Sequence, residues 1–356
     1  MKFTVFTPKT KPLLGVDIGT TFIKAVLLAP GKQPSEWQCH GIACELIPTS
    51  AFKERDILDF DSIVITLKQI MLKLSLKQQA TVIAVSGSAV ISKMIRMPKQ
   101  LNDLHLEEHI HIEADSLIPY QLEHVYWDFE RIPQNSTHSH FDNVLLTVAH
   151  KQLVDNRMTV VREAGLKPVI VDTELDALEN LVLLNSEHRN REDVTIHVGN
   201  ELMHIIVVNK NQVLYSKEHQ FGIHSLLQDI ALTQQCSVTE ILNKLSQNVL
   251  NPQWQTDVLP IFYAQLTQQI LRVCQLVQDS LDIDSPQRIH LCGGVGMLPN
   301  ITQSLSQALA LEVNLLDPTT HMSISDKVSS EQLEACKPML CIATGLALRN
   351  SCNGIH

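Results

Sequence analysis

Two hydrophobic hairpins, each with a glycine at its bend, recur at an offset of 180 residues and restrict this 356-residue chain to a duplicated architecture. The first hairpin reads VDIGTTFIKAVLL (residues 16–28), and the second reads IHVGNELMHIIVV (196–208). Apolar residues align with apolar residues at nearly every step, and each hairpin opens a half that continues as strand, helix and strand. Because strands and helices alternate, the expected fold class is α/β. Three further pairs align at this offset: Asp17 with His197, Gly19 with Gly199, and Lys24 with His204.

Composition limits the possible partners and the compartment. The formal net charge of −10 argues against nucleic acid as the main partner, because binding a phosphate backbone needs a surplus of Lys and Arg. No stretch approaches the ~18 apolar residues of a membrane-spanning helix. The N-terminus lacks the apolar core of a signal peptide, because Lys9 and Lys11 interrupt it. The eight cysteines form no CxxC spacing and are interpreted as reduced structural thiols. A cytosolic protein is therefore expected.

Apolar periodicity and turn residues predict the elements outside the hairpins. Pro119 stops one expected helix, and Gly165 is a C-cap signal for another. Helices are expected over residues 58–74, 104–117, 151–164, 173–185, 224–249 and 258–281, and strands over 80–87, 90–98, 124–132, 143–150, 167–172 and 288–294.

The first hairpin carries the residue types that hold a phosphate. Gly19 permits the tight bend, Thr20 and Thr21 supply hydroxyl and N–H groups, and Lys24 adds positive charge. A carboxylate cannot bind phosphate directly, so the expected task of Asp17 is to hold Mg²⁺ through water. The alternative is a structural hairpin in which Asp17 only forms the turn.

A third glycine turn follows late in the chain, in IHLCGGVGMLPNI (289–301). Gly293, Gly294 and Gly296 let the main chain pass close to a flat ligand or a phosphate before a helix begins. The turn is not GxGxxG, and no Walker A motif occurs in the chain. The significance of this turn lies in its position after the two hairpins.

This order of two phosphate loops and an adenosine loop resembles the actin/hexokinase/DnaK-type ATPase superfamily. More specifically, most of residues 13–350 is similar to the PilM family of type IV pilus assembly proteins. The matching segments are LLGVDIGTTFIKAVLL, VSGSAVISKMIRMP, LEEHIHIEADSLIPYQLEHVYWDFERI, VLLTVAHKQLVDNRMTVVREAGLKPVIVDTELDALEN, FGIHSL, HLCGGVGMLPNI and CIATGLALR.

The resemblance implies an α/β, actin-like (ribonuclease H-like) duplicated ATPase fold with an FtsA-like inserted subdomain. Four parts are expected: a first actin-like subdomain (1–91 and 171–192), the inserted subdomain (92–170), a second actin-like subdomain (193–223 and 286–356) and a helical small subdomain (224–285).

The resemblance also implies ATP or ADP with Mg²⁺ in the cleft between the halves. The implied contacts are the first phosphate loop (Asp17, Gly19, Thr20, Thr21, Lys24), the second (Gly199, Asn200, with Gly222), the adenosine loop (Gly293, Gly294, Gly296) and Glu174, which faces the cleft. The second loop departs from the family pattern Asp-Ile-Gly-Ala, because His197 stands at the position of the acid, and Ile223 replaces the second glycine of an FGG motif. A neutral imidazole cannot replace a carboxylate towards Mg²⁺, so weak or absent hydrolysis is expected.

The function implied is that of a cytoplasmic scaffold, peripheral on the inner membrane and attached to it only through protein partners. The implied partner is the N-terminal tail of PilN, held in a groove between the inserted and first subdomains and flanked by strands 90–98 and 124–132, with Ile95 expected to face the groove. Indirect links to a PilO/PilP complex and to cytosolic pilus motor ATPases are also implied. The main alternative is a small-molecule kinase of the same superfamily. A related type II secretion component is a further alternative, although it is fused to a membrane span.

A separate histidine cluster lies in the inserted region. His105 and His109 are one helical turn apart, which is a spacing that can hold zinc, but the segment is not HExxH. A solvated helix face is the preferred interpretation.

Overall fold

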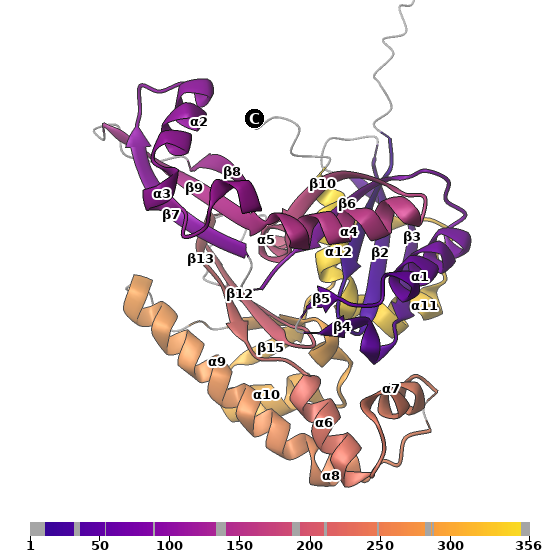
Figure 1. Cartoon of the computed structure of the whole chain (residues 1–356). Helices are drawn as coiled ribbons and strands as arrows, with labels where there is room; N and C mark the ends of the chain where they lie inside the picture. The colour runs from indigo at the N-terminus through magenta and orange to yellow at the C-terminus, as the bar shows by residue number, and fades with distance from the viewer. Residues whose placement is uncertain are drawn as a thin grey trace, which may run out of the picture.

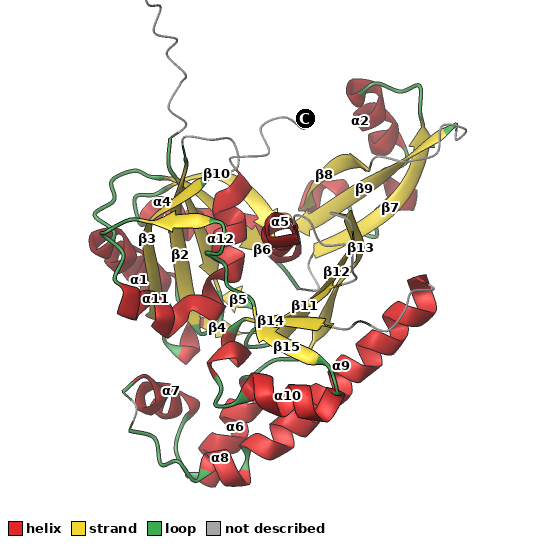
Figure 2. Cartoon of the chain, turned by 180° about the vertical axis from the view of Figure 1, so that it is seen from behind, coloured by secondary structure: helices red, strands yellow, loops and turns green. Residues whose placement is uncertain are grey.

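The computed structural model describes residues 11–31, 36–53, 55–87, 90–132, 140–186, 193–209, 212–247, 249–281, 286 and 288–349. Two large sheets with their covering helices form the body of the molecule, and a smaller sheet projects from it (Figure 1; the reverse side is shown in Figure 2).

The first large sheet has six strands in the order β10-β6-β1-β2-β3-β16. The second has five strands in the order β13-β12-β11-β14-β15. Their bounds are β1 (Leu13–Ile18), β2 (Phe22–Pro30), β3 (Trp37–Leu46), β6 (Ala80–Val85), β10 (Lys167–Thr173), β16 (Met322–Ile324), β11 (Asp193–Val198), β12 (Leu202–Asn209), β13 (Gln212–Gln220), β14 (Arg288–Cys292) and β15 (Glu312–Leu315).

The predicted duplication is confirmed strand by strand. In each sheet the antiparallel hairpin pairs on one side with a parallel strand, β6 or β14, and on the other with an antiparallel strand, β3 or β13. The registers differ by the predicted 180 residues, because Asp17 faces Lys24 in the first hairpin and His197 faces His204 in the second. Each turn is closed by an equivalent hydrogen bond. The Gly19 N–H donates to the Phe22 carbonyl (3.1 Å), and the Gly199 N–H donates to the Leu202 carbonyl (2.9 Å).

Helices cover both faces of the first sheet. The outer face is packed by α1 (Phe60–Lys73) and α4 (Lys151–Glu163), and the inner face by α5 (Glu174–Ser186) and α12 (Cys341–Ala347). Helix α5 also packs against β12, so it lies between the two sheets. The amphipathic pattern of α1 explains its placement, since Ile63, Leu67 and Ile70 are buried on one side and the Asp59 carboxylate caps its first turn.

Five helices share one hydrophobic core with the second sheet. The prediction of a single helix over residues 224–249 is wrong. The helix ends at Thr233, and Gln235 has a positive φ of 51°. A capping box between Ser237 and Glu240 then starts a new helix. These helices are α6 (His224–Thr233), α7 (Val238–Ser246), α8 (Trp254–Asp257), α9 (Leu259–Leu281) and α10 (Ile301–Leu309).

The small sheet, in the order β7-β9-β8, is inserted between β6 and β10 of the first sheet. One of its faces is covered by two helices, and β8 lies at an edge. Ile95 is only 6% exposed and packs in this covered core, so the expectation that it faces a groove is wrong; alternate strand residues point to opposite faces. The elements are β7 (Val90–Pro98), α2 (Asp103–Ile112), α3 (Ala114–Leu117), β8 (Val125–Ile132) and β9 (Phe141–His150).

The C-terminal elements return to the first sheet. Strand β16 pairs with β3, and α11 (Ser330–Cys336) and α12 pack on the same side. The range 286–356, expected to belong to the second subdomain, therefore contributes to both sheets, and the other subdomain boundaries stay predictions. None of the helices in the described ranges is long and apolar enough to cross a membrane. The short elements are β4 (Phe52–Lys53), β5 (Asp56–Ile57), η1 (Thr49–Ala51), η2 (Leu122–His124), η3 (Gly294–Met297) and η4 (Lys337–Leu340).

Candidate functional site

The tips of the two hairpins meet between the large sheets. The side-chain amide of Asn200 donates a hydrogen bond to the Thr20 hydroxyl, at 2.9 Å. These residues are equivalent in the repeat, since they are 180 positions apart. The contact therefore lies where the two halves face each other, and it brings the tips of both predicted phosphate loops together. This junction of the two halves is called the cleft below.

The second hairpin is joined to the start of α6. The Ile223 N–H donates to the Gly199 carbonyl (3.0 Å), and the His224 N–H donates to the Asn200 carbonyl (2.8 Å). A Cβ atom at Gly222 would overlap that Asn200 carbonyl, so only glycine permits this approach.

The third predicted loop lies beside the second hairpin. Gly293 has a φ of 88°, and a Cβ atom there would overlap the Val198 carbonyl. Gly294 lies against Ile223, so the glycine turn at 293–294 also contacts the start of α6. Gly296 is separate from the hairpins and lies against Pro338 and Leu315.

An ion pair lies next to the turn of the first hairpin. The Lys24 ammonium lies 2.7 Å from the Asp17 carboxylate and also donates to the Phe22 carbonyl at 3.3 Å. Asp17 is 3% exposed; burial raises its pKa, and the Lys24 charge opposes that rise. The positive charge of Lys24 is thus partly used inside the hairpin. Thr21 is buried, and its carbonyl accepts a hydrogen bond from the Ile47 N–H.

A histidine pair takes the equivalent place in the second hairpin. His197 is 5% exposed, and its Nδ1 lies 3.4 Å from the Nδ1 of His204. Burial, followed by the neighbouring His204, lowers the pKa of His197 to about 3, so its imidazole is neutral at physiological pH. Where the first hairpin holds an acid and a base, the second hairpin holds two imidazoles at the equivalent positions.

Glu174 begins α5 at the junction of the two halves and is buried. Its carboxylate pairs with the Arg55 guanidinium at 2.6 Å, and Arg55 also donates to the Ser86 hydroxyl. Burial alone would raise the pKa of Glu174, but Arg55 and then His204 prevail and hold that pKa at about 2. Sequence reasoning missed Arg55, because a single arginine between the short strands β4 and β5 gives no motif.

A second contact connects the halves through the same carboxylate. His204 Nε2 lies 3.7 Å from Glu174 and 3.3 Å from Glu218, which stands on β13. The Gly87 N–H, at the end of β6, donates to Glu218 at 3.2 Å. Arg55, Glu174, His204, Glu218 and Gly87 form a chain of contacts across the cleft, called here the cross-cleft network.

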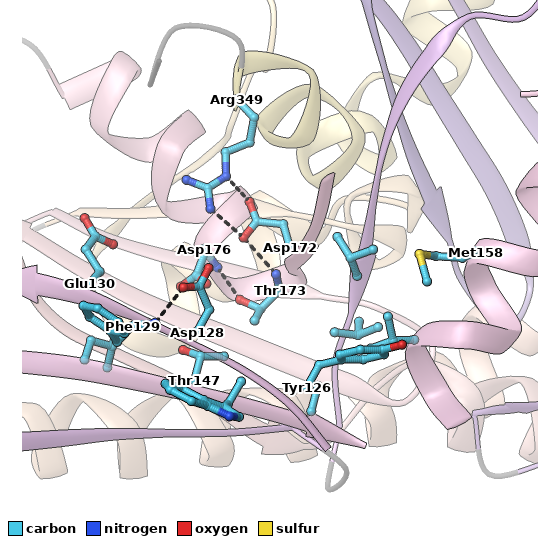
Figure 3. A pocket seen from close by; sticks show the side chains of 16 residues that line it. Tyr126, Asp128, Phe129, Glu130, Thr147, Met158, Asp172, Thr173, Asp176 and Arg349 are labelled. Carbon is cyan, nitrogen blue, oxygen red and sulfur yellow. Dashed lines mark hydrogen bonds and ion pairs between the residues drawn. The ribbon is translucent and has the colours of Figure 1, made fainter. Parts of the chain in front are cut away.

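A separate pocket of about 390 Å³ lies between the inserted sheet and the first sheet (Figure 3). Strand β9 contributes alternate residues, Leu145, Thr147 and Ala149, which point away from the covered core. Strand β8 instead contributes five consecutive residues, 126–130. Since successive side chains of a strand point to opposite faces, the pocket must follow the edge of β8.

That edge is not paired in the described part of the chain. The Phe129 N–H donates to the side chain of Asp128 (2.8 Å) instead of to a neighbouring strand. The opposite wall is polar: Asp172 pairs with Arg349 at 2.7 Å, and the Asp176 N–H donates to the Thr173 hydroxyl at 3.0 Å (Figure 3). Burial raises the pKa of Asp172 to about 6 despite the Arg349 charge.

The zinc alternative finds no support. His109 pairs with Glu113 at 3.3 Å on an exposed helix face, and within the described ranges no group of three or more His, Cys, Asp or Glu residues is arranged to hold a metal ion.

Two duplicated halves with glycine-turn hairpins facing one cleft define the actin-like ATPase fold. A solved PilM–PilN type IV pilus biogenesis complex is similar over 97% of this chain and 99% of that one, with 22% identity and a TM-score of 0.80. The ethanolamine utilization protein EutJ from Carboxydothermus hydrogenoformans is similar over 95% of this chain and 90% of its own, with 14% identity and a TM-score of 0.55.

A match between this sequence and a protein-family model shows the family to which the chain belongs. The model of the family described as type IV pilus assembly protein PilM matches residues 15–351. The chain belongs to this family.

Proposed function

We propose that this protein is a nucleotide-binding scaffold of the type IV pilus machinery, held at the inner membrane by the N-terminal tail of PilN. This proposal rests mainly on the pocket along β8, whose edge has no paired strand among the residues that the structure describes. The family match and the similarity to a PilM–PilN complex support this choice of partner.

The pocket suits an extended peptide. The edge of β8 offers main-chain groups for an added strand, which is how many domains bind short segments. Apolar walls from Val154, Met158 and Val171 suit leucine side chains, and the carboxylates of Asp128 and Asp176 suit a basic group. Links to PilO/PilP and to the motor ATPases remain predictions.

The cleft between the hairpins suits a nucleotide. Main-chain turns at Gly19 and Gly199 and the polar side chains of Thr20 and Asn200 would hold the phosphates, and the turn at Gly293 and Gly294 would face the base and ribose. The bound nucleotide would supply phosphate oxygens for Mg²⁺, which Asp17 would hold through water.

Turnover is proposed to be weak or absent. The second hairpin presents neutral His197 where the family pattern has an acid, and Glu174 is held in an ion pair with Arg55. A carboxylate with a pKa of about 2 is a poor proton acceptor at neutral pH.

The docking proposal is tested by Leu145→Glu, which places a charge in the pocket without entering the covered core. Titration calorimetry with a synthetic PilN-type tail peptide should show affinity reduced by about tenfold or more, since a buried unpaired charge costs at least ~1.4 kcal/mol. Leu104→Glu is the matched control, because Leu104 is exposed on α2 of the same unit. Equal peptide affinity in both variants would refute the docking site.

The nucleotide proposal is tested by Asp17→Ala. Titration with a fluorescent ATP analogue and Mg²⁺ should show weakened binding, whereas Asp326→Ala, in an exposed loop, should leave it unchanged. Unchanged affinity in Asp17→Ala would rule out the first hairpin as the phosphate loop.

A further inference from the structure

One buried arginine has no partner in the described structure. Arg157, on α4, is 1% exposed, and none of its three guanidinium nitrogens has a hydrogen-bond partner. Burying a cation without compensation is strongly unfavourable. The other deeply buried ionic groups are compensated: Asp17 by Lys24 and Glu174 by Arg55.

The helix that carries Arg157 packs on the elements that build the cleft. Helix α4 contacts β5, β6 and β10. Arg55 immediately precedes β5, Ser86 follows β6, and Glu174 follows β10. Arg157 thus lies behind the charged wall that the first half presents to the cleft.

The electrostatic surroundings agree with this placement. After burial, the nearby positive charge of Arg55 is the main influence that lowers the pKa of Arg157, to about 10. Glu174 and Asp17 act in the opposite direction. Arg157 therefore interacts with charged groups of the cleft, although none of them is close enough to pair with it.

The nearby ion pairs leave Arg157 without a paired carboxylate. Asp17 is paired with Lys24 and Glu174 with Arg55, and none of the three Arg157 nitrogens has a hydrogen-bond partner. The Nε of Arg55 also lacks a hydrogen-bond partner. Two guanidinium groups with unused donors therefore belong to the group of charges around Glu174.

We infer that Arg157 provides the positive charge that makes the cleft prefer a nucleoside triphosphate to a diphosphate. The inference rests on the proposed nucleotide binding. A triphosphate brings an additional negative charge, and a buried cation attracts it strongly because solvent does not screen the interaction. Arg157 would then decrease the stability of the empty protein and increase its affinity for the triphosphate.

The test compares Arg157→Met, which keeps side-chain length without charge, with Arg157→Lys, which keeps charge. Arg162→Met is the matched control, because Arg162 is exposed on the same helix. Thermal unfolding is measured without nucleotide, and calorimetry measures the affinities for Mg²⁺ with AMPPNP and with ADP.

Wild type and Arg157→Lys are expected to favour AMPPNP over ADP by about tenfold or more, because solvent does not screen the buried charge from the additional phosphate. Arg157→Met should lose most of that preference and unfold at a higher temperature than wild type when empty. A retained preference in Arg157→Met, or a lower unfolding temperature of the empty variant, would overturn the inference. Absence of any nucleotide binding by wild type would instead refute the proposed nucleotide function, and the inference with it.

Discussion

At the scale of single residues, the two halves differ most at the paired positions inside their hairpins. The first half has Asp17 facing Lys24, and the second has His197 facing His204. An acid and a base of opposite charge stabilise each other when buried, whereas burial and the neighbouring His204 lower the pKa of His197. The exchange keeps the hairpin but puts a neutral, acid-sensitive His197 where the first half has a charged pair.

This sensitivity gives a pH prediction for His197. Its pKa is about 3 in the folded protein and near 6.5 in the unfolded chain. Below pH ~6.5 the unfolded state binds a proton that the folded state does not, so stability falls as the pH decreases, by up to roughly 1.4 kcal/mol per unit. His197→Gln should lose less stability over this range.

Urea unfolding of both proteins at several pH values between about 7 and 5 measures this difference in slope. Absolute stability is not compared, because the substitution also changes packing. Parallel slopes for wild type and His197→Gln would show that His197 is not buried in its neutral form.

At the scale of elements, the edge of β8 gives a prediction that distinguishes peptide binding through main-chain hydrogen bonds from binding through side chains. The Phe129 N–H donates to the Asp128 side chain on the edge strand β8, where Pro is better tolerated than in a central strand, and Pro at this position removes that donor. Phe129→Ala removes the same aromatic ring and keeps the N–H. If the PilN tail adds as a strand, Phe129→Pro should bind it about tenfold more weakly than Phe129→Ala.

Fluorescence anisotropy with a labelled tail peptide compares the two variants directly, and circular dichroism checks that both remain folded. Equal affinities would mean that the tail binds through side chains alone and not by strand addition.

The hairpins and the inserted strands were predictable because their signals are local. Bend glycines and apolar runs predicted β1, β2, β11 and β12, and the constant offset already aligned Asp17 with His197 and Lys24 with His204. The S-x-x-E signal at Ser237 could have divided the helix over 224–249, but apolar periodicity concealed it. The position of Ile95 was mispredicted because periodicity shows that a strand has two faces but not which one is covered.

The cross-cleft network could not be predicted, because its members are joined only by the tertiary fold. Arg55 and Glu174 are 119 residues apart, and Gly87 and Glu218 are 131 apart. Neither pair carries a spacing rule. The partnerless Arg157 was equally hidden, since an arginine within an amphipathic helix is ordinarily on its solvent side.

At the scale of the whole molecule, a single wall separates the two proposed sites. Val85 and Thr173 line the pocket, while the residues that follow them, Ser86 and Glu174, belong to the cleft. The ends of β6 and β10 therefore touch both sites. A movement of these ends on binding at one site would be transmitted to the other through adjacent peptide bonds.

The relative position of the halves should depend on the cross-cleft network. Glu218→Ala removes the acceptor of the Gly87 N–H and the neighbour of His204, and hydrogen bonds to charged groups contribute about 1.5–3 kcal/mol. Hydrogen exchange of the segment ending at Gly87 should therefore become about tenfold faster or more. Lys217→Ala, on the same strand with its side chain exposed, is the control. Bound nucleotide should restore part of the protection, because it would connect both hairpins independently of Glu218. Unchanged exchange in Glu218→Ala would mean that α5 and the Thr20–Asn200 contact hold the halves together without this network.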